Sequence, residues 1–284
     1  VAAVFAMVMA AKKVAGKSLT EKLDYLRKAK TRLTNTRPTN TALAQRLNDA
    51  LKIAEGAAQN GISVEDALLD WIEKTRDKIY ENYEYRARLG ASLVDDGDGI
   101  LTMCFAETSF ILAMAFAKED GKNINVFTPE TRPYLQGARL TAPSLHELGI
   151  PVQIITDNMP AHIMSQGKIQ KYFTAADLIT LDGHVCNKIG TFQNAIAAHH
   201  HSIPYFVFMW GVDYKSPDRA SIKVENRDPA EVKLCRGVAT TIDAIDAYYP
   251  AFDITPPYMV SGIITIHGIL SPYDLKRHFT QDVS

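Results

Sequence analysis

The sequence predicts an α/β protein in which an N-terminal helical domain precedes a domain built on a mainly parallel sheet. Up to Leu89, apolar residues recur at helical spacing. Beyond Gly90, short apolar runs alternate with helical patterns of about a dozen residues, which is typical of right-handed βαβ units and a parallel sheet. The 284 residues, of which 46% are apolar, are enough for two domains.

Four helices are predicted before residue 90. The opening segment, residues 1–13, predicts a buried helix, because its apolar run is too short to span a bilayer and no basic segment precedes it. Ser18–Arg32 begins with a capping pattern, and Pro38 starts the helix predicted over Thr39–Ala57. Ser63 is the expected N-cap of a long helix that ends at Leu89. Because the first residue is not Met, we expect a further segment upstream.

The second part alternates strands with helices. A turn is predicted at Asp95–Gly99, and Gly121, Gly149 and Gly167 fit helix C-caps. The predicted strands are Ile100–Cys104, Ile124–Thr128, Val152–Thr156, Tyr172–Thr180 and Tyr205–Trp210, and the predicted helices are Ser109–Asp120, Gln136–Leu148, Ala161–Gln166 and Thr191–His201.

Charge indicates neither a nucleic-acid nor a membrane partner. The net charge is −1, so an anion has to be met by a local site. The charges of Glu73–Lys78 and Tyr85–Arg88, on the last N-terminal helix, are interpreted as a solvated face.

Several kinds of site are not expected. The chain has no GxGxxG or GxxxxGK[ST] motif, so a standard dinucleotide or P-loop site is not supported. Its cysteines, Cys104, Cys186 and Cys235, are odd in number and lack CxxC spacing, which favours a reducing cytoplasm over a disulfide framework or a zinc cluster. Three adjacent histidines, His199–His201, cannot face one metal from one helix face, so no metal site is predicted.

Four polar places follow predicted strands. They are Cys104, the stretch Glu130–Gly137, Asp157 with Asn158, and the stretch Thr174–Thr191. Because ligands of open parallel sheets bind outside the carboxyl ends of the strands, we expect these places to converge on one site.

Cys104 and Asp177 are the groups with acid–base potential. Cys104 is either a small core residue or, at a strand end, a thiol whose pKa is tuned by the site. The apolar neighbours of Asp177 predict a desolvated carboxyl that is paired or holds its proton, although a cap or structural hydrogen bond is an equal alternative. Both would suit proton transfer near neutral pH.

Four cations are candidate phosphate ligands, because guanidinium and ammonium groups match phosphate. Lys188 follows Asn187 in the stretch Thr174–Thr191, where nearby glycines let a ligand approach the backbone. Arg37, Arg132 and Arg139 are the others, and each alone is more often a surface cation; Arg132 and Arg139 can also pair locally, for example with Glu130.

Four motifs in order, PETRPYLQGARLTA, IPVQIITDNMPAHIM, AADLITLDGHVCNKIGT and PAFDITPPYMVSGIIT, resemble the 5-methylthioribose-1-phosphate isomerase family. Its relatives are the ribose-1,5-bisphosphate isomerases and the regulatory subunits of the translation factor eIF2B. The resemblance covers nearly the whole chain and is densest over residues 90–270. It implies a helical domain, residues 1–90, a Rossmann-like domain, residues 91–284, a site between them, and a homodimer formed through the larger domain.

The same resemblance implies roles for individual residues. Cys104 in ILTMC and Asp177 in AADLI match the catalytic Cys and Asp of the enzymes. Arg37 in Arg-Pro-Thr looks like a phosphate ligand, and Gln136, Asn187 and Lys188 look like substrate contacts. Because both acid–base positions are occupied, the non-catalytic regulatory reading is disfavoured.

Departures from the family pattern bear on the substrate. Where the enzymes usually have Thr-His-Cys-Asn-Ala-Gly, this chain has TMCFAE at Thr102–Glu107. Where they have Asp-Glu-Thr-Arg-Pro, it has PETRP at Pro129–Pro133. The family motif Arg-Gly-Ala-Pro is absent from the given sequence. Apolar Met103 and Phe105 would suit a bare methyl group at C5, so 5-deoxyribose 1-phosphate in 5-deoxy-sugar salvage stands beside 5-methylthioribose 1-phosphate in methionine salvage. Ribose 1,5-bisphosphate is the alternative substrate, and a regulatory sugar- or nucleotide-phosphate sensor is the non-enzymatic one.

The chemistry expected is aldose–ketose isomerisation without a metal or organic cofactor. The ring opens with phosphate retained, and a proton moves from C2 to C1 through a cis-enediolate, with Cys104 and Asp177 dividing the acid–base work. Which of the two abstracts the C2 proton is left open, and a hydride shift is the rival path.

Overall fold

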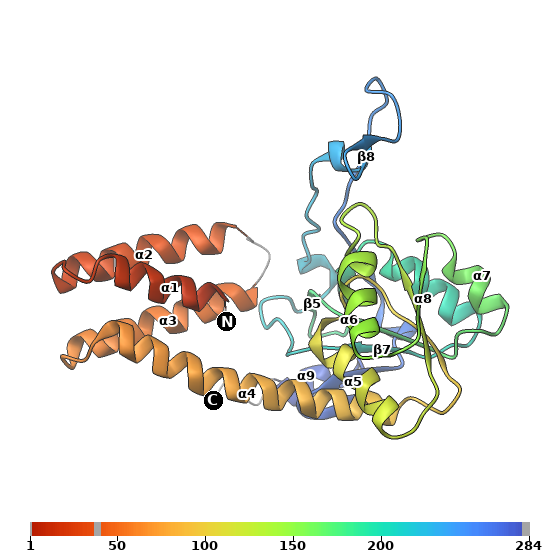
Figure 1. Cartoon of the computed structure of the whole chain (residues 1–284), viewed down its shortest axis with the longest axis horizontal. Helices are drawn as coiled ribbons and strands as arrows, with labels where there is room; N and C mark the ends of the chain where they lie inside the picture. Colours follow the sequence, from red (N-terminus) through yellow and green to blue (C-terminus); the bar gives the residue numbers. More distant parts are fainter. Residues whose placement is uncertain (1, 37–40, 280–284) are drawn as a thin grey trace. The chain divides into compact units, whose positions relative to one another are not determined.

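A computed structural model describes residues 2–36 and 41–279 and divides the chain into two compact units, residues 1–81 and 82–284 (Figure 1). Helix α4 (Val64–Ser92) runs out of the first unit into the second. The boundary near residue 90 therefore stays a prediction. No helix in the described ranges is both long and apolar enough to cross a membrane.

The first unit is helical. Besides the start of α4 it contains α1 (Ala2–Lys13), α2 (Leu19–Asn35) and α3 (Thr41–Gln59), which pack around a shared apolar core (Figure 1). The capping box predicted at Ser18 forms, because its side chain accepts from the Glu21 amide and the Glu21 carboxylate accepts in return. Ser63 Oγ likewise accepts the Asp66 amide, which confirms the predicted cap of α4.

The second unit is built on a seven-stranded sheet of order β12-β11-β7-β4-β1-β2-β3. Each neighbouring pair is parallel except β11 with β12, so the predicted mainly parallel sheet is confirmed. The strands are β1 (Gly99–Leu101), β2 (Asn125–Pro129), β3 (Val152–Ile155), β4 (Lys171–Ala175), β7 (Tyr205–Phe208), β11 (Gly262–Thr265) and β12 (Gly268–Leu270).

Both faces of this sheet are covered. Successive strand residues point to opposite faces, so Leu101 and Tyr172 enter one apolar cluster while Ile100 and Phe173 enter the other. The helices over these clusters are α5 (Glu107–Glu119) and α6 (Ala142–Glu147) on one face, and α7 (Pro160–Ser165), α8 (Thr191–His200) and α9 (Leu275–Phe279) on the other.

A second sheet, of order β10-β6-β5, corrects one predicted strand. The run Tyr172–Thr180 is not continuous: β4 ends at Ala175, and the chain leaves the parallel sheet to form β5 (Leu178–Ile179). There it pairs with β6 (Val185–Lys188), which in turn pairs antiparallel with β10 (Phe252–Thr255). Asp177 stands at the break, and its amide donates to the Cys186 carbonyl.

Smaller differences follow from local geometry. Gly121, Gly149 and Gly167 have φ of 82°, 65° and 68°, as the predicted C-caps require. The helix predicted over Gln136–Leu148 begins as a π-helix, η1 (Gly137–Thr141), and continues as the α-helix α6. The remaining elements are η2 (Arg219–Ser221), η3 (Pro229–Glu231), β8 (Leu234–Cys235), β9 (Val238–Ala239) and η4 (Pro257–Met259).

The interpretation of Tyr85–Arg88 as a solvated face is wrong for Arg86. The Arg86 side chain is fully buried, and its guanidinium donates to the Glu107 carboxylate at 2.5 Å. A buried charge persists only when it is paired, and here the first residue of α5 supplies the pair. Arg88 is exposed, as expected.

Candidate active site

Cys104 lies beyond the carboxyl end of β1 in a left-handed conformation, with φ of 62°. The sequence predicted that Cys104 is the last residue of this strand. In the structure it follows the last strand residue by three positions and lies in a bend. Two threonines hold this bend: the Cys104 amide donates to Thr131 Oγ1 at 3.1 Å, and Thr141 Oγ1 donates to the Cys104 carbonyl at 2.5 Å. A non-glycine residue with positive φ costs about 1 kcal/mol or more, and such residues cluster at functional sites.

The turn after β2 is fixed to the end of β3. Both carboxylate oxygens of Asp157 accept backbone amides at 2.7 Å, one from Thr131 and one from Arg132. Since Thr131 also binds the Cys104 amide, three of the four polar places meet at the carboxyl edge of the sheet. This convergence was predicted from the positions of the strands.

Asn187 and Lys188 lie in β6 rather than in a turn, and each is only 4% exposed. Asn187 Nδ2 donates to Thr191 Oγ1, which donates to the Lys188 carbonyl. The chain then turns at Gly190, whose φ is 99° and where a Cβ atom would come within 2.9 Å of Met103 Cε. A side chain at residue 190 would therefore push directly on the neighbour of Cys104.

Asp253 of β10 anchors this turn. Its carboxylate accepts the Gly190 amide at 2.7 Å and the Phe192 amide at 3.1 Å, at the start of α8. Burial raises the pKa of Asp253 to about 6. Asp253 thus fixes the direction of the segment that carries Asn187 and Lys188.

The charges around Cys104 come from three different segments. The pKa of the thiol is raised to about 11, chiefly by burial and to a smaller extent by the negative charge of Asp177. The backbone hydrogen bond with Phe105 and the positive charges of Lys188 and Arg227 act in the opposite direction. Burial also lowers the pKa of Lys188, and so does the charge of Arg227, while Cys104 and Asp177 act in the opposite direction. Cys104, Asp177 and Lys188 therefore interact electrostatically, although they are far apart in the sequence.

Asp177 differs from expectation in its surroundings. Its side chain is exposed, in the bend between β4 and β5, so the desolvation expected from its apolar sequence neighbours is wrong. The reason is the strand break, which turns residue 177 out of the sheet while Leu178 and Ile179 pair with β6.

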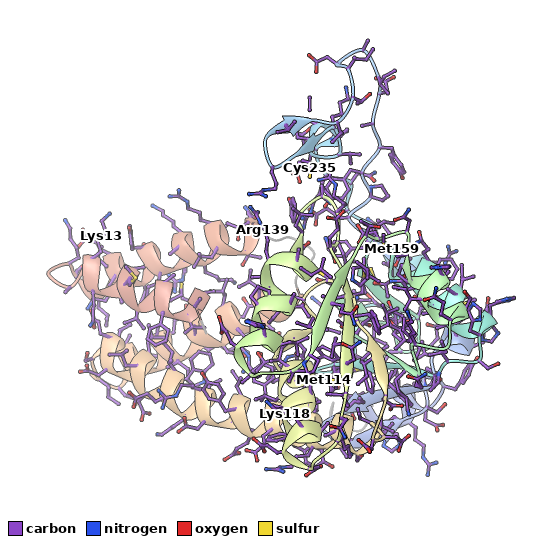
Figure 2. All side chains as sticks on the ribbon, turned by 45° about the vertical axis from the view of Figure 1, so that its right-hand side comes forward. Lys13, Met114, Lys118, Arg139, Met159 and Cys235 are labelled. Atoms are coloured by element: carbon purple, nitrogen blue, oxygen red, sulfur yellow. The ribbon has the colours of Figure 1, made fainter. Side chains whose placement is uncertain are left out.

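The remaining predicted residues have distinct surroundings. Gln136 Oε1 is buried with no hydrogen-bond partner among the described residues, as suits an acceptor for a ligand hydroxyl. The Arg132 guanidinium donates to the carbonyls of Pro133 and Val232. Arg139 is exposed on η1 (Figure 2). Arg37 lies outside the described residues.

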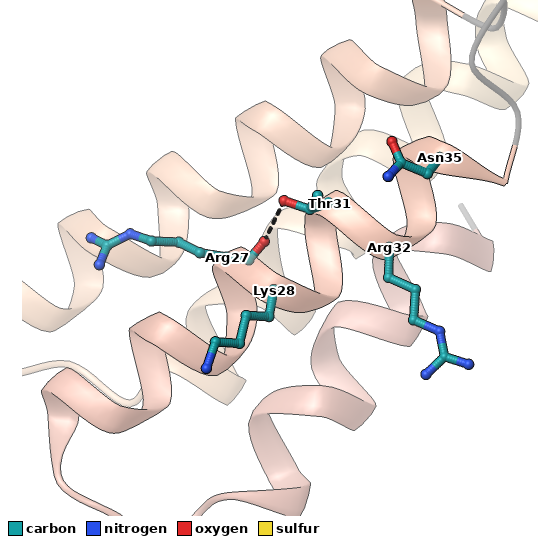
Figure 3. A pocket seen from close by; sticks show the side chains of 5 residues that line it. All are labelled: Arg27, Lys28, Thr31, Arg32 and Asn35. Carbon is teal, nitrogen blue, oxygen red and sulfur yellow. Dashed lines mark hydrogen bonds between the residues drawn. The ribbon is translucent and has the colours of Figure 1, made fainter.

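One hollow is lined in part by the predicted residue Arg132, and a second lies in the first unit. The first, of about 510 Å³, is lined by Met103, Arg132, Asp157 and Asp253 together with the start of α8. The other, of about 540 Å³, lies in the first unit along α2 and is lined by Arg27, Lys28, Thr31, Arg32 and Asn35 (Figure 3). Arg27 there is already ion-paired with Asp24 and Glu55. Within the described residues, no group of three His, Cys, Asp or Glu side chains is arranged to hold a metal ion.

Alkylation should report the state of Cys104. At pH 8 a thiol of pKa 11 has about 100-fold less thiolate than an unperturbed cysteine thiol of pKa 9. Because the thiolate is the reactive form, iodoacetamide should modify Cys104 about 100-fold more slowly than an unperturbed thiol. The rate should rise about tenfold per pH unit up to pH 10. Peptide mass spectrometry separates Cys104 from Cys235, and a rate that levels off below pH 9 would contradict the raised pKa.

The family model for the initiation factor 2 subunit family matches residues 1–272. Methylthioribose-1-phosphate isomerase of Xanthomonas campestris is 35% identical over 98% of this chain and 80% of its own length. The protein of the same name from Chloroflexus aurantiacus is 37% identical over 95% of this chain and 81% of its own.

Solved structures of similar fold carry two kinds of name. The crystal structure of 5-methylthioribose 1-phosphate isomerase from Pyrococcus horikoshii superposes with a TM-score of 0.84 at 32% identity, over 99% of this chain and 81% of that one. The crystal structure of translation initiation factor eIF-2B subunit delta from A. fulgidus superposes with a TM-score of 0.82, also at 32% identity. The superposition covers 99% of this chain and 84% of that one. The fold therefore does not distinguish an enzyme from a translation factor subunit, and the residues of the site have to decide.

Proposed function

The chain belongs to the initiation factor 2 subunit family, and from this premise we propose that it is an isomerase of sugar 1-phosphates whose substrate is 5-methylthioribose 1-phosphate. The observation that supports this most is the similarity, over nearly the whole chain, to relatives named methylthioribose-1-phosphate isomerase. The electrostatic grouping of Cys104, Asp177 and Lys188 agrees with it, since a translation factor subunit needs no acid–base pair beside a buried cation.

The reaction takes four proton transfers in three steps. Breaking the C1–O4 bond opens the ring, and O4 takes a proton. Loss of the C2 proton then leaves a C1–C2 double bond with the phosphate still on C1. Protonation of C1 and loss of the C2 hydroxyl proton give the ketose 1-phosphate. No electron leaves the substrate, so acid–base groups and an oxyanion-stabilising cation are sufficient.

The protonation state of Cys104 suggests an order of action. Cys104 has a raised pKa and is protonated at neutral pH, so we assign it the first proton donation. We assign Asp177, in the bend between β4 and β5, as the base that removes the C2 proton. Buried Lys188 and Asn187 hold the substrate oxygens, and Gln136 Oε1 accepts a sugar hydroxyl. Arg37 is the further phosphate ligand in this scheme.

The substituent at C5 is the part of the proposal that needs a panel of substrates. Met103 is buried beside Cys104 and Phe105 follows it, so an apolar C5 group is favoured over a phosphate. Assayed side by side, 5-methylthioribose 1-phosphate and 5-deoxyribose 1-phosphate should both be converted, with kcat/KM about tenfold or more above that for ribose 1,5-bisphosphate, because a dianion beside apolar groups loses its solvation. A preference for the bisphosphate would contradict this assignment.

The cellular setting is proposed on the same resemblance. We expect a cytoplasmic homodimer that serves methionine or 5-deoxy-sugar salvage. Light scattering on the purified chain would give twice the chain mass of 31.4 kDa, and a monomeric mass would contradict the dimer.

A further inference from the structure

Arg227 is a charged residue of the site that the proposed mechanism has not used. It lies between η2 and η3, in a segment without regular structure, and its amide donates to the Tyr249 carbonyl. Its Nε donates to Glu225 Oε1 at 2.9 Å, which fixes the direction of the guanidinium. Its guanidinium is therefore a cation of fixed orientation.

Arg227 and Lys188 share the same two aromatic rings. The Arg227 Cζ atom lies 4.8 Å from the centroid of the Tyr134 ring and 5.9 Å from that of Phe252. Lys188 Nζ lies 4.8 Å from the Phe252 centroid and 5.6 Å from that of Tyr134. The rings come from the turn after β2 and from β10, so two segments of the fold converge to hold a pair of cations.

Two like charges in one place repel each other, and the Glu225 carboxylate offsets only part of the positive charge of the pair. Burial lowers the pKa of Lys188, and the positive charge of Arg227 lowers it further, as expected for two cations held close together. Both cations also lower the pKa of Cys104, so both act on the thiol. A guanidinium binds phosphate through two parallel hydrogen bonds and an ammonium binds it as a point charge, so the two would complement each other on one dianion.

We propose that Arg227 is a further substrate-binding residue, which forms with Lys188 a pair of cations that binds the phosphate group of the substrate beside Cys104. The identity of that phosphate as part of a sugar 1-phosphate rests on the function proposed above. The anion site itself rests on the shared rings, the Glu225 contact and the nearby thiol. Tyr134 and Gln136 belong to the same turn, so phosphate held by the cations would bring the sugar toward the unpaired Gln136 Oε1.

The test uses inorganic phosphate as the probe and the full chain as the protein. Iodoacetamide modification of Cys104 is followed by peptide mass spectrometry at constant ionic strength and rising phosphate concentration. Phosphate should protect the thiol of the wild type. In Arg227→Met the phosphate concentration that gives half-maximal protection should rise about tenfold or more. This is the loss of affinity expected when one charge-assisted hydrogen bond is removed. Arg227→Lys should lie between the two, because it keeps the charge and loses the planar fork.

Arg219→Met is the matched control. Arg219 is an exposed cation of η2, eight residues before Arg227, and its loss should leave protection unchanged. The pH profile of alkylation without phosphate separates an electrostatic role from a merely structural one: its midpoint should move up in Arg227→Met and return toward the wild type in Arg227→Lys. If circular dichroism shows that Arg227→Met is unfolded, Arg227→Lys is compared with the wild type instead.

Two results would overturn the inference. One is phosphate protection of Arg227→Met and Arg227→Lys at the wild-type concentration, and the other is a wild-type thiol that phosphate does not protect. A wild type that is protected through Arg227 yet converts no aldose 1-phosphate would instead contradict the proposed isomerase function and leave the anion site in place.

Discussion

Replacing Cys104 by serine is expected to lower kcat about 10³-fold, with a much smaller change in KM. A hydroxyl is a far weaker acid than a thiol, so the proposed first proton donation should be lost while the proposed substrate contacts through Lys188 and Gln136 remain. Asp177→Asn should show a loss of similar size, because the amide cannot accept the exchanged proton. Steady-state kinetics on 5-methylthioribose 1-phosphate measure both effects.

The matched control for this prediction is Cys235→Ser. Cys235 is half-buried in β8, which pairs with β9 in a small hairpin, and no role in the site is assigned to it. Its replacement should leave kcat within about twofold of the wild type. Comparable activity of Cys104→Ser and Cys235→Ser would remove Cys104 from the mechanism.

Replacing Glu107 by alanine is expected to lower the free energy of unfolding of the second unit by about 3 kcal/mol. The substitution leaves the Arg86 guanidinium fully buried without its carboxylate and removes the acceptor of Trp210 Nε1. Urea unfolding followed by fluorescence measures the change. In a Trp71→Phe background the signal comes from Trp210, whose ring lies 4.5 Å from Arg86 Cζ.

Two further variants separate the causes. Burial raises the pKa of Glu107 in spite of Arg86, so desolvation outweighs the attraction within the pair. Exchanging both residues, as Arg86→Met with Glu107→Ala, should therefore recover most of the lost stability. Glu107→Gly should be about 1 kcal/mol more stable than Glu107→Ala, because Glu107 has φ of 66°. An unchanged urea midpoint in Glu107→Ala would contradict this account of the pair.

Sequence patterns predicted the architecture because they reflect local physics. Helical periodicity, the Ser18 capping box and the left-handed glycines are properties of a few adjacent residues, and all three appear in the structure. The parallel sheet follows from the alternation of strands with helices. The convergence of Cys104, Thr131 and Asp157 follows in turn from parallel strands having their carboxyl ends at one edge.

Other features depend on contacts between distant segments, which no local pattern records. The break at Asp177 exists because β6 and β10 offer a second sheet, and residues 172–180 look like one strand without them. Buried Arg86 resembles any charge on a solvated helix face until Glu107 is placed against it. In both cases tertiary pairing overrides the local pattern.

Arg227 and Asp253 were missed as site residues for related reasons. Arg227 lies in a stretch with no periodicity, and its role becomes visible only through two rings contributed by other segments. Asp253 lies within the motif PAFDITPP, and a carboxylate inside an apolar strand was the available signal for it. Arg37, a phosphate ligand by resemblance, lies outside the described residues and stays a prediction.

The most direct test of the central claim is the conversion of 5-methylthioribose 1-phosphate in deuterated water, followed by proton and phosphorus NMR. The wild type should form a ketose 1-phosphate with solvent deuterium at C1, because the proton passes through Cys104 or Asp177. Cys104→Ser should form no product on the same timescale. Product without deuterium would indicate a hydride shift in place of acid–base transfer. Recovery of unchanged substrate from the wild type would contradict the claim that this chain is an isomerase of that sugar phosphate.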